Sequence, residues 1–131
     1  MNLLLDTHTL IWFFDGSDNL SDEATVKIED PVIGKFLSVA SFWEIAIKIS
    51  IGKLRMELSM ENLERLVWEN DMDILPIRIE HTFPLRNLPF HHKDPFDRLI
   101  VAQLLVEGMD IVSGDEVFDQ YLENRTIKRI W

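Results

Sequence analysis

Four acidic residues stand at comparable points of this sequence and are of a type that could hold a metal ion. Asp6 and Asp115 each follow a short apolar run, while Glu44 and Asp97 each lie near the start of a predicted apolar helix. Four carboxylates brought to one place would repel one another, and a divalent cation would offset that repulsion. Oxygen ligands suit Mg²⁺ or Mn²⁺, which activate water and stabilise charge on a phosphoryl group. The set therefore favours metal-assisted hydrolysis of a phosphodiester bond.

The stretch HHKDPFDRLI, residues 91–100, illustrates why one acid alone is not decisive. Aspartate suits the cap of a helix and proline its first position, so Asp94 and Pro95 predict a helix start. Asp97 then lies in the first turn, where a carboxylate also interacts favourably with the helix dipole. We interpret Asp94 mainly as a cap, with a supporting role beside a metal site left open.

The other three acids also have a structural interpretation. Ser41 and Glu44 match the S-x-x-E capping box, which places Glu44 in the first turn of its helix. Asp115 can cap the helix that follows it, and Asp6 can cap a helix starting near Thr7. Because capping residues are common, the structural interpretation is favoured for any one acid alone. Only the four acids taken together favour a metal site over a purely structural role.

Short apolar segments alternate with helical ones along the chain. The expected strands cover residues 2–5, 35–39, 73–76, 110–113 and 127–130. The expected helices cover residues 21–29, 41–51, 59–70, 77–85 and 95–107, with helix-like content at 8–14 and a short helix ending at Tyr121. This alternation predicts an α/β fold with a parallel sheet, and residues 1–131 read as a single domain.

A parallel sheet of this kind would bring the four acids to one place. The carboxyl ends of its strands and the amino ends of its helices share one edge, where ligands bind. Asp6 and Asp115 follow strands, and Glu44 and Asp97 lie early in helices. All four side chains are therefore expected at the same edge of the sheet.

Composition excludes several classes of protein. The chain has 131 residues, of which 47% are hydrophobic, so extensive disorder is not expected. It has no cysteine, which rules out disulfides, a thiol nucleophile and cysteine-bound zinc. The formal net charge of −10 argues against a polyanionic ligand unless bound cations reverse the local sign. No signal peptide or membrane span is apparent, so a cytoplasmic protein is expected.

Four segments also resemble a known family. LLLDTHTLIW, ASFWEIAIKISIGKL, HHKDPFDRLIVAQ and IVSGDEVF, in this order, resemble PIN-domain ribonucleases and, more narrowly, VapC-type toxins of toxin–antitoxin pairs. The resemblance implies a three-layer α/β/α sandwich with a central parallel sheet of roughly five strands. It also implies Mg²⁺- or Mn²⁺-dependent endoribonuclease activity, an RNA substrate, an antitoxin partner and a homodimer.

The acidic residues of the family correspond to positions in this sequence. The resemblance implies that the metal-binding and catalytic residues are Asp6, Glu44, Asp97 and Asp115. Our hypothesis is that Asp6 and Asp97 bind the principal metal ion directly and that Glu44 and Asp115 complete the site. Ser113 resembles the small hydroxyl residue that the family has two positions before its fourth acid. Asp94 lies outside the general set of four.

Basic side chains near these segments are candidates for guiding RNA phosphates. The alternative is that they form a solvated fringe, and the two interpretations carry similar weight. A transition-metal site at the adjacent residues His91 and His92 is not favoured, because no third ligand accompanies them. The candidates are Lys48, Lys53, Arg55, His91, His92, Lys93 and Arg98.

Two aromatic clusters and one histidine each allow more than one structural interpretation. The clusters are residues 12–14 (WFF) and 42–43 (FW), for which core packing or a protein interface is favoured over base stacking. His8, near Asp6, either lines the cleft or is a buried, hydrogen-bonded residue.

The sequence is also compatible with two functions other than that of a nuclease. A non-catalytic α/β module that binds protein or RNA would use the acids as caps and the aromatic clusters as an interface. A phosphatase with Asp6 as nucleophile would need a second aspartate two residues later, where this chain has His8. Nuclease activity is favoured over both.

Overall fold

The computed structural model describes residues 1–131 and contains one five-stranded sheet. All four pairings between neighbouring strands are parallel, and the strand order is β3-β2-β1-β4-β5. The strands are β1 (Asn2–Leu5), β2 (Gly34–Ser38), β3 (Met72–Leu75), β4 (Asp110–Val112) and β5 (Arg129–Ile130). The predicted parallel sheet is confirmed.

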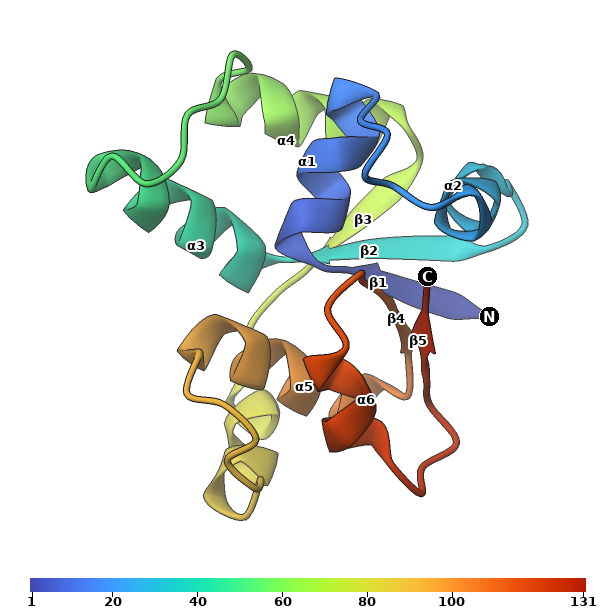
Figure 1. Cartoon of the computed structure of the whole chain (residues 1–131), viewed down its shortest axis with the longest axis vertical. Helices are drawn as coiled ribbons and strands as arrows, with labels where there is room; N and C mark the ends of the chain where they lie inside the picture. Colours follow the sequence, from blue (N-terminus) through green and yellow to red (C-terminus); the bar gives the residue numbers. More distant parts are fainter.

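Helices cover both faces of this sheet. They are α1 (Thr7–Asp15), α2 (Asp22–Glu29), α3 (Val39–Ser50), α4 (Met60–Glu69), the 3₁₀ helix η1 (Ile79–Arg86), α5 (Pro95–Glu107) and α6 (Val117–Leu122). In Figure 1, α1 to α4 lie on one side of the sheet, and α5 and α6 lie on the other. The predicted three-layer α/β/α sandwich is therefore confirmed.

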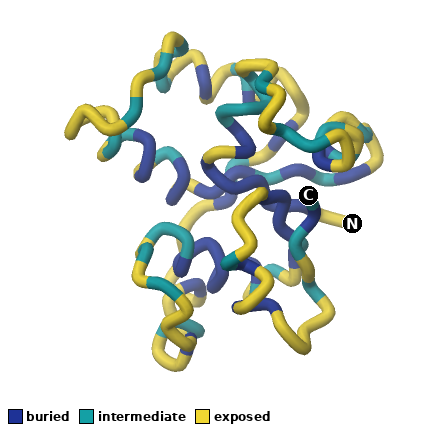
Figure 2. Tube along the Cα trace, viewed as in Figure 1, coloured by how far each residue is buried: buried dark blue, intermediate teal, exposed yellow.

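Strand β1 occupies the centre of the sheet and divides its side chains between two cores. Leu3 and Leu5 belong to the core beneath α1, α2 and α4, whereas Leu4 belongs to the core beneath α5 and α6. All three are fully buried, as expected for a central strand covered on both faces. Figure 2 shows this buried layer running through the middle of the molecule. The strand is thereby fixed in a position that delivers Asp6 to the sheet edge.

The start of α5 follows the sequence prediction. Asp94 caps the helix, because its Oδ1 accepts hydrogen bonds from the backbone N–H of Phe96 (2.9 Å) and of Asp97 (3.1 Å). Pro95 takes the first helical position, where its missing N–H has no consequence. The helix ends at Gly108, whose φ of 68° lies in the left-handed region that glycine adopts without strain. Asp97 is thus fixed in the first turn.

The predicted capping box at Ser41 and Glu44 is wrong. Helix α3 begins at Val39, directly after β2, and its cap is Ser38, three residues before the predicted cap; Ser38 accepts a hydrogen bond from the backbone N–H of Ala40 (3.0 Å). Ser41 is instead buried inside the helix against Thr7. Glu44 consequently lies in the second turn, and its carboxylate is free of any capping role.

Two other elements differ from their predicted form. The predicted helix at residues 77–85 is the 3₁₀ helix η1, which contains Pro84 and so lacks a backbone donor that an α-helix would use. The predicted last strand is shorter, because only Arg129 and Ile130 pair with β4. No helix of the chain has the length and apolar character needed to cross a bilayer.

Candidate functional site

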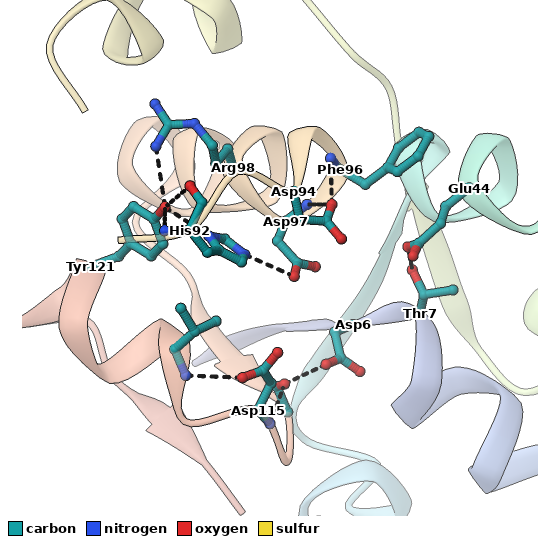
Figure 3. A network of polar contacts seen from close by, with 12 residues as sticks. Asp6, Thr7, Glu44, His92, Asp94, Phe96, Asp97, Arg98, Asp115 and Tyr121 are labelled. Atoms are coloured by element: carbon teal, nitrogen blue, oxygen red, sulfur yellow. Dashed lines mark hydrogen bonds and ion pairs between the residues drawn. The ribbon is translucent and has the colours of Figure 1, made fainter. Parts of the chain in front are cut away.

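The four predicted acids come from four different elements and meet at the carboxyl edge of the sheet. Asp6 follows β1 and caps α1, and Asp115 follows the neighbouring strand β4. Glu44 projects from α3 and Asp97 from the start of α5. Figure 3 shows the carboxylates of Asp6, Asp97 and Asp115 around one space, with Glu44 beside it. The sheet-edge argument from the sequence therefore describes their placement correctly.

Asp6 is held rigidly by two hydrogen bonds. It is buried, and its Oδ1 accepts a hydrogen bond from the backbone N–H of Thr9 (2.8 Å). The Ser113 hydroxyl donates to Oδ2, and the same hydroxyl accepts from the backbone N–H of Asp115 (3.0 Å). Burial raises the pKa of Asp6, and the hydrogen bonds from Ser113 and Thr9 oppose that rise. Ser113 therefore links two of the four acids.

Glu44 is tied to the residue that follows Asp6. It is buried, and its Oε1 accepts a hydrogen bond from Thr7 Oγ1 (2.7 Å). Its Oε2 accepts from Lys48 Nζ one helical turn later (2.6 Å). The Lys48 ammonium also lies within the electrostatic range of Asp94 and Asp97. Lys48, predicted as a guide for RNA phosphate, thus contacts the acidic site itself.

The charge of Asp97 is also disfavoured by its surroundings. Burial is the largest cause that raises its pKa to about 6; the nearby carboxylates of Asp94 and Glu44 contribute to this rise, and the hydrogen bond from His92 opposes it. A carboxylate with this pKa is ionised at neutral pH but gains from any added positive charge.

A chain of hydrogen bonds orients Asp97. His92 Nε2 lies 3.1 Å from Asp97 Oδ2, and His92 Nδ1 lies 2.8 Å from the Tyr121 hydroxyl. Arg98 Nη1 donates to that same hydroxyl (3.1 Å). Figure 3 shows this line of contacts running from α6 to the acidic space. The sequence offered His92 either as a guide for RNA phosphates or as part of a solvated fringe, and neither interpretation included this contact with Asp97. The role of Tyr121 was missed because no local pattern links it to residue 92.

Arg98 is neither an RNA contact nor part of a solvated fringe, so both predictions for it are wrong. Its guanidinium is buried, donating to the backbone carbonyls of Pro89 (2.7 Å) and Leu88 (3.1 Å). It also stacks on the Phe90 ring, with Cζ 3.8 Å from the ring centroid. Arg98 therefore fixes the segment that precedes α5. The exposed members of the predicted basic group are Lys53, Arg55, His91 and Lys93.

A cavity of about 380 Å³ adjoins the acids on the side of Asp6 and Asp115. Its lining residues are Asp6, His8, Trp12, Asn19, Gly114, Asp115 and Trp131. His8 is exposed and lines this cavity, which decides between its two predicted placements. Phe13, Phe14 and Phe42 pack against the core as predicted, whereas Trp12 lines the cavity and Trp43 is exposed.

The chemistry of these side chains fits a divalent cation. The groups that could ligate a metal ion are carboxylate oxygens. The pKa values of Asp6 and Asp97 are raised mainly by burial, so both negative charges are disfavoured in the absence of a cation. In the present rotamers, no three acidic or histidine side chains are placed to ligate one ion together. Lys48 pairs with Glu44 in this arrangement, so side-chain rotation would have to accompany ion binding by Glu44.

The comparisons with known proteins agree with this fold. The family model of the PIN domain matches residues 3–123, so the chain belongs to the PIN domain family. The fold is similar to that in the crystal structure of VapBC2 from Rickettsia felis bound to a DNA fragment from the promoter. That match has a TM-score of 0.68 and 14% identity, and covers 100% of both chains.

A second solved structure gives the same result. A toxin–antitoxin complex from Klebsiella pneumoniae matches with a TM-score of 0.59 and 17% identity, over 96% of this chain and 94% of the other. At these identities the two likenesses describe the fold. The search of curated proteins returns no match.

Proposed function

We propose that this PIN-domain protein is a divalent-metal-dependent endoribonuclease that hydrolyses RNA phosphodiester bonds. The observation that carries the proposal is the meeting of four carboxylates, from four separate elements, at one sheet edge. The pKa of Asp97, raised to about 6, supports it, because capping roles alone would not require carboxylates to be buried near one another. The choice of RNA rests on the resemblance of the four sequence segments to PIN-domain ribonucleases.

Each acid has a proposed role. Asp6 and Asp97 would be the principal ligands of a Mg²⁺ or Mn²⁺ ion, and Glu44 and Asp115 would complete the site directly or through water. When bound, such an ion supplies positive charge for the phosphodiester and lowers the pKa of water.

The surrounding side chains prepare the acids for this role. The Ser113 hydroxyl holds Asp6 and the backbone of Asp115 together, and His92 holds one oxygen of Asp97. Thr7 fixes Glu44. These hydrogen bonds orient the carboxylates before any ligand arrives, which reduces the reorganisation needed on binding.

The acidic net charge is compatible with an RNA substrate under this proposal. The bound cations reverse the sign of the potential where the phosphate must lie, so the total charge of −10 does not decide the local field. Lys53 and Lys93 are exposed and free to contact more distant phosphates. RNA affinity is accordingly expected to depend on the divalent ion.

We further propose that the protein is a VapC-type toxin that pairs with an antitoxin. Two similar folds are those of VapBC2 and of a toxin–antitoxin complex, which supports this assignment. Trp43 and Ile47 on helix α3, and Ile51 directly after it, also form an exposed apolar stripe, spaced four residues apart. Such a stripe suits the apolar face of a partner segment. A homodimer is proposed as well, and light scattering of the purified protein would test it.

Cleavage of a labelled structured-RNA pool by purified protein tests the nuclease proposal. Cutting is expected with Mg²⁺ or Mn²⁺, none with EDTA, and none by the Asp6→Asn variant under any condition. Cutting that persists in EDTA would refute the metal site. Absence of cutting by a folded, antitoxin-free wild type would favour the non-catalytic binding module instead.

A further inference from the structure

The cavity beside the acids offers a surface that phosphodiester hydrolysis itself does not need. It shares Asp6 and Asp115 with the candidate metal site, but its remaining wall includes two indole rings. Trp12 and Trp131 come from opposite ends of the chain, and their ring centroids lie 5.9 Å apart with a 54° tilt. Both rings are only partly buried.

We propose that this cavity binds one unpaired nucleobase of the RNA, next to the phosphate that is cleaved. The inference rests on the proposed nuclease function and deepens it by naming the residues that would bind a base beside the cleaved phosphate. An RNA whose phosphate lies at Asp6 and Asp115 places a neighbouring base within reach of Trp12. Indole faces stack on any base, because every base has a π-face.

The other lining groups favour a base over a phosphate. The cavity contains two carboxylates and no lysine or arginine, so a second phosphate would be repelled there. The Asn19 amide can donate and accept hydrogen bonds, and both carboxylates can accept them from the N–H groups of a base. His8 stacks beside Trp12, with ring centroids 5.7 Å apart, and extends the aromatic wall.

Gly114 has no Cβ, which allows the indole ring of Trp131 to lie close to the backbone. A Cβ at this position would lie 3.0 Å from Cε2 and 3.1 Å from Cζ2 of Trp131, closer than most real contacts. Trp131 therefore lies directly over the Gly114–Asp115 turn, beside a predicted metal ligand. Trp131 also packs against the core formed with β1, whereas Trp12 does not, so Trp12 is the cleaner position for a test.

The test uses an RNA with a single cleavage position and two matched RNAs that lack the base on one side or the other of that position. With wild type, removing one of the two bases is expected to lower kcat/KM by about 5- to 150-fold, the range of one base–aromatic stack. Trp12→Ala should lose a similar factor on the intact RNA and lose nothing more on the RNA without that base. Trp12→Phe should recover part of the loss.

Trp68→Ala is the matched control, because Trp68 is exposed on α4 and lines none of these walls. It should behave as wild type on all three RNAs. If Trp12→Ala cleaves the intact RNA as wild type does, or loses the same additional factor as wild type when the base is removed, the subsite is refuted while the nuclease assignment stands.

A binding measurement keeps the inference testable if no RNA is cleaved. The chain has four tryptophans, so the double variant Trp43→Phe/Trp68→Phe leaves Trp12 and Trp131 as the only indole fluorophores. In Mg²⁺, single-stranded RNA that the protein does not cleave should quench their fluorescence, and a sugar–phosphate oligomer without bases should not. Equal quenching by both, or quenching by neither, would refute the base subsite whatever the outcome of the cleavage assay.

Discussion

Asp94 and Asp97 lie three residues apart in one helical turn, yet their surroundings give them different roles. Asp94 Oδ1 accepts two backbone N–H groups and stabilises the start of α5. The Asp97 carboxylate faces the other acids and is bound by His92. The same residue type therefore serves as a helix cap at position 94 and as a candidate metal ligand at position 97.

Replacing Asp97 by asparagine should stabilise the metal-free protein at neutral pH. The folded-state pKa of Asp97 is about 6, above its ordinary value of 3.8, so the folded protein binds this proton more tightly than the unfolded chain does. The associated stability is fully present below about pH 3.8 and is lost as the pH rises to about 6. Asp97→Asn removes that loss and should gain about 1–3 kcal/mol at pH 7.5.

Urea unfolding in EDTA at pH 7.5 and at pH 4 would measure this difference. The gain should be present at pH 7.5 and largely absent at pH 4, where wild-type Asp97 is itself mostly protonated. A variant that is less stable than wild type at pH 7.5, or a gain that is the same at both values, would contradict this description of Asp97.

Replacing Ser113 by alanine should weaken metal binding without disturbing the fold. The hydroxyl donates to Asp6 and accepts from the backbone of Asp115, so its loss raises the pKa of Asp6 further and loosens the Asp115 turn. Loss of such a supporting group typically lowers metal affinity by about 10- to 100-fold. Calorimetric titration with Mn²⁺ measures the change, and an affinity equal to that of wild type would exclude the role of Ser113.

At the scale of elements, the start of α5 was predictable and the start of α3 was not. Asp94 and Pro95 act through their own backbone, so their sequence suffices. In α3, two serines three residues apart compete for the cap. Ser38 is the cap, and Ser41 is instead buried against Thr7, which lies 34 positions away in the sequence. Local patterns do not encode such a contact.

The cap of α5 can be separated from the charge of Asp94 by two variants. Asp94→Ala removes the acceptor of two N–H groups and should cost about 1 kcal/mol of stability. Asp94→Asn keeps an oxygen that can accept them, so its stability should remain within about 0.5 kcal/mol of wild type. Chemical denaturation measures both. Equal losses in the two variants would mean that charge, rather than capping, is what Asp94 contributes.

For the whole molecule, the parallel sheet and the shared edge of the four acids followed from alternating apolar segments and a general rule about such sheets. The strand order did not follow, nor did the line from Tyr121 through His92 to Asp97 or the cavity between Trp12 and Trp131. Each of these joins segments that are far apart in the chain. The sequence could identify the acids but not the groups that orient them.

A divalent ion should stabilise the whole fold through the acids. An ion that binds only the folded protein adds about 2.7 kcal/mol when its concentration is 100 times its Kd. Thermal unfolding with Mn²⁺ should therefore raise the Tm of wild type, with a smaller rise for Asp6→Asn and for Asp97→Asn. Identical rises in all three proteins would place the bound ion elsewhere on this acidic molecule.

The most direct test of the metal-dependent nuclease site is Mn²⁺-dependent RNA cleavage by three proteins compared side by side: wild type, Asp97→Asn and Asp94→Asn. The two variants change the same residue type in the same helical turn and remove the same charge. We predict that Asp97→Asn has no detectable activity and that Asp94→Asn retains most of it. Full activity in Asp97→Asn, in a preparation that needs Mn²⁺, would contradict the assignment of the site.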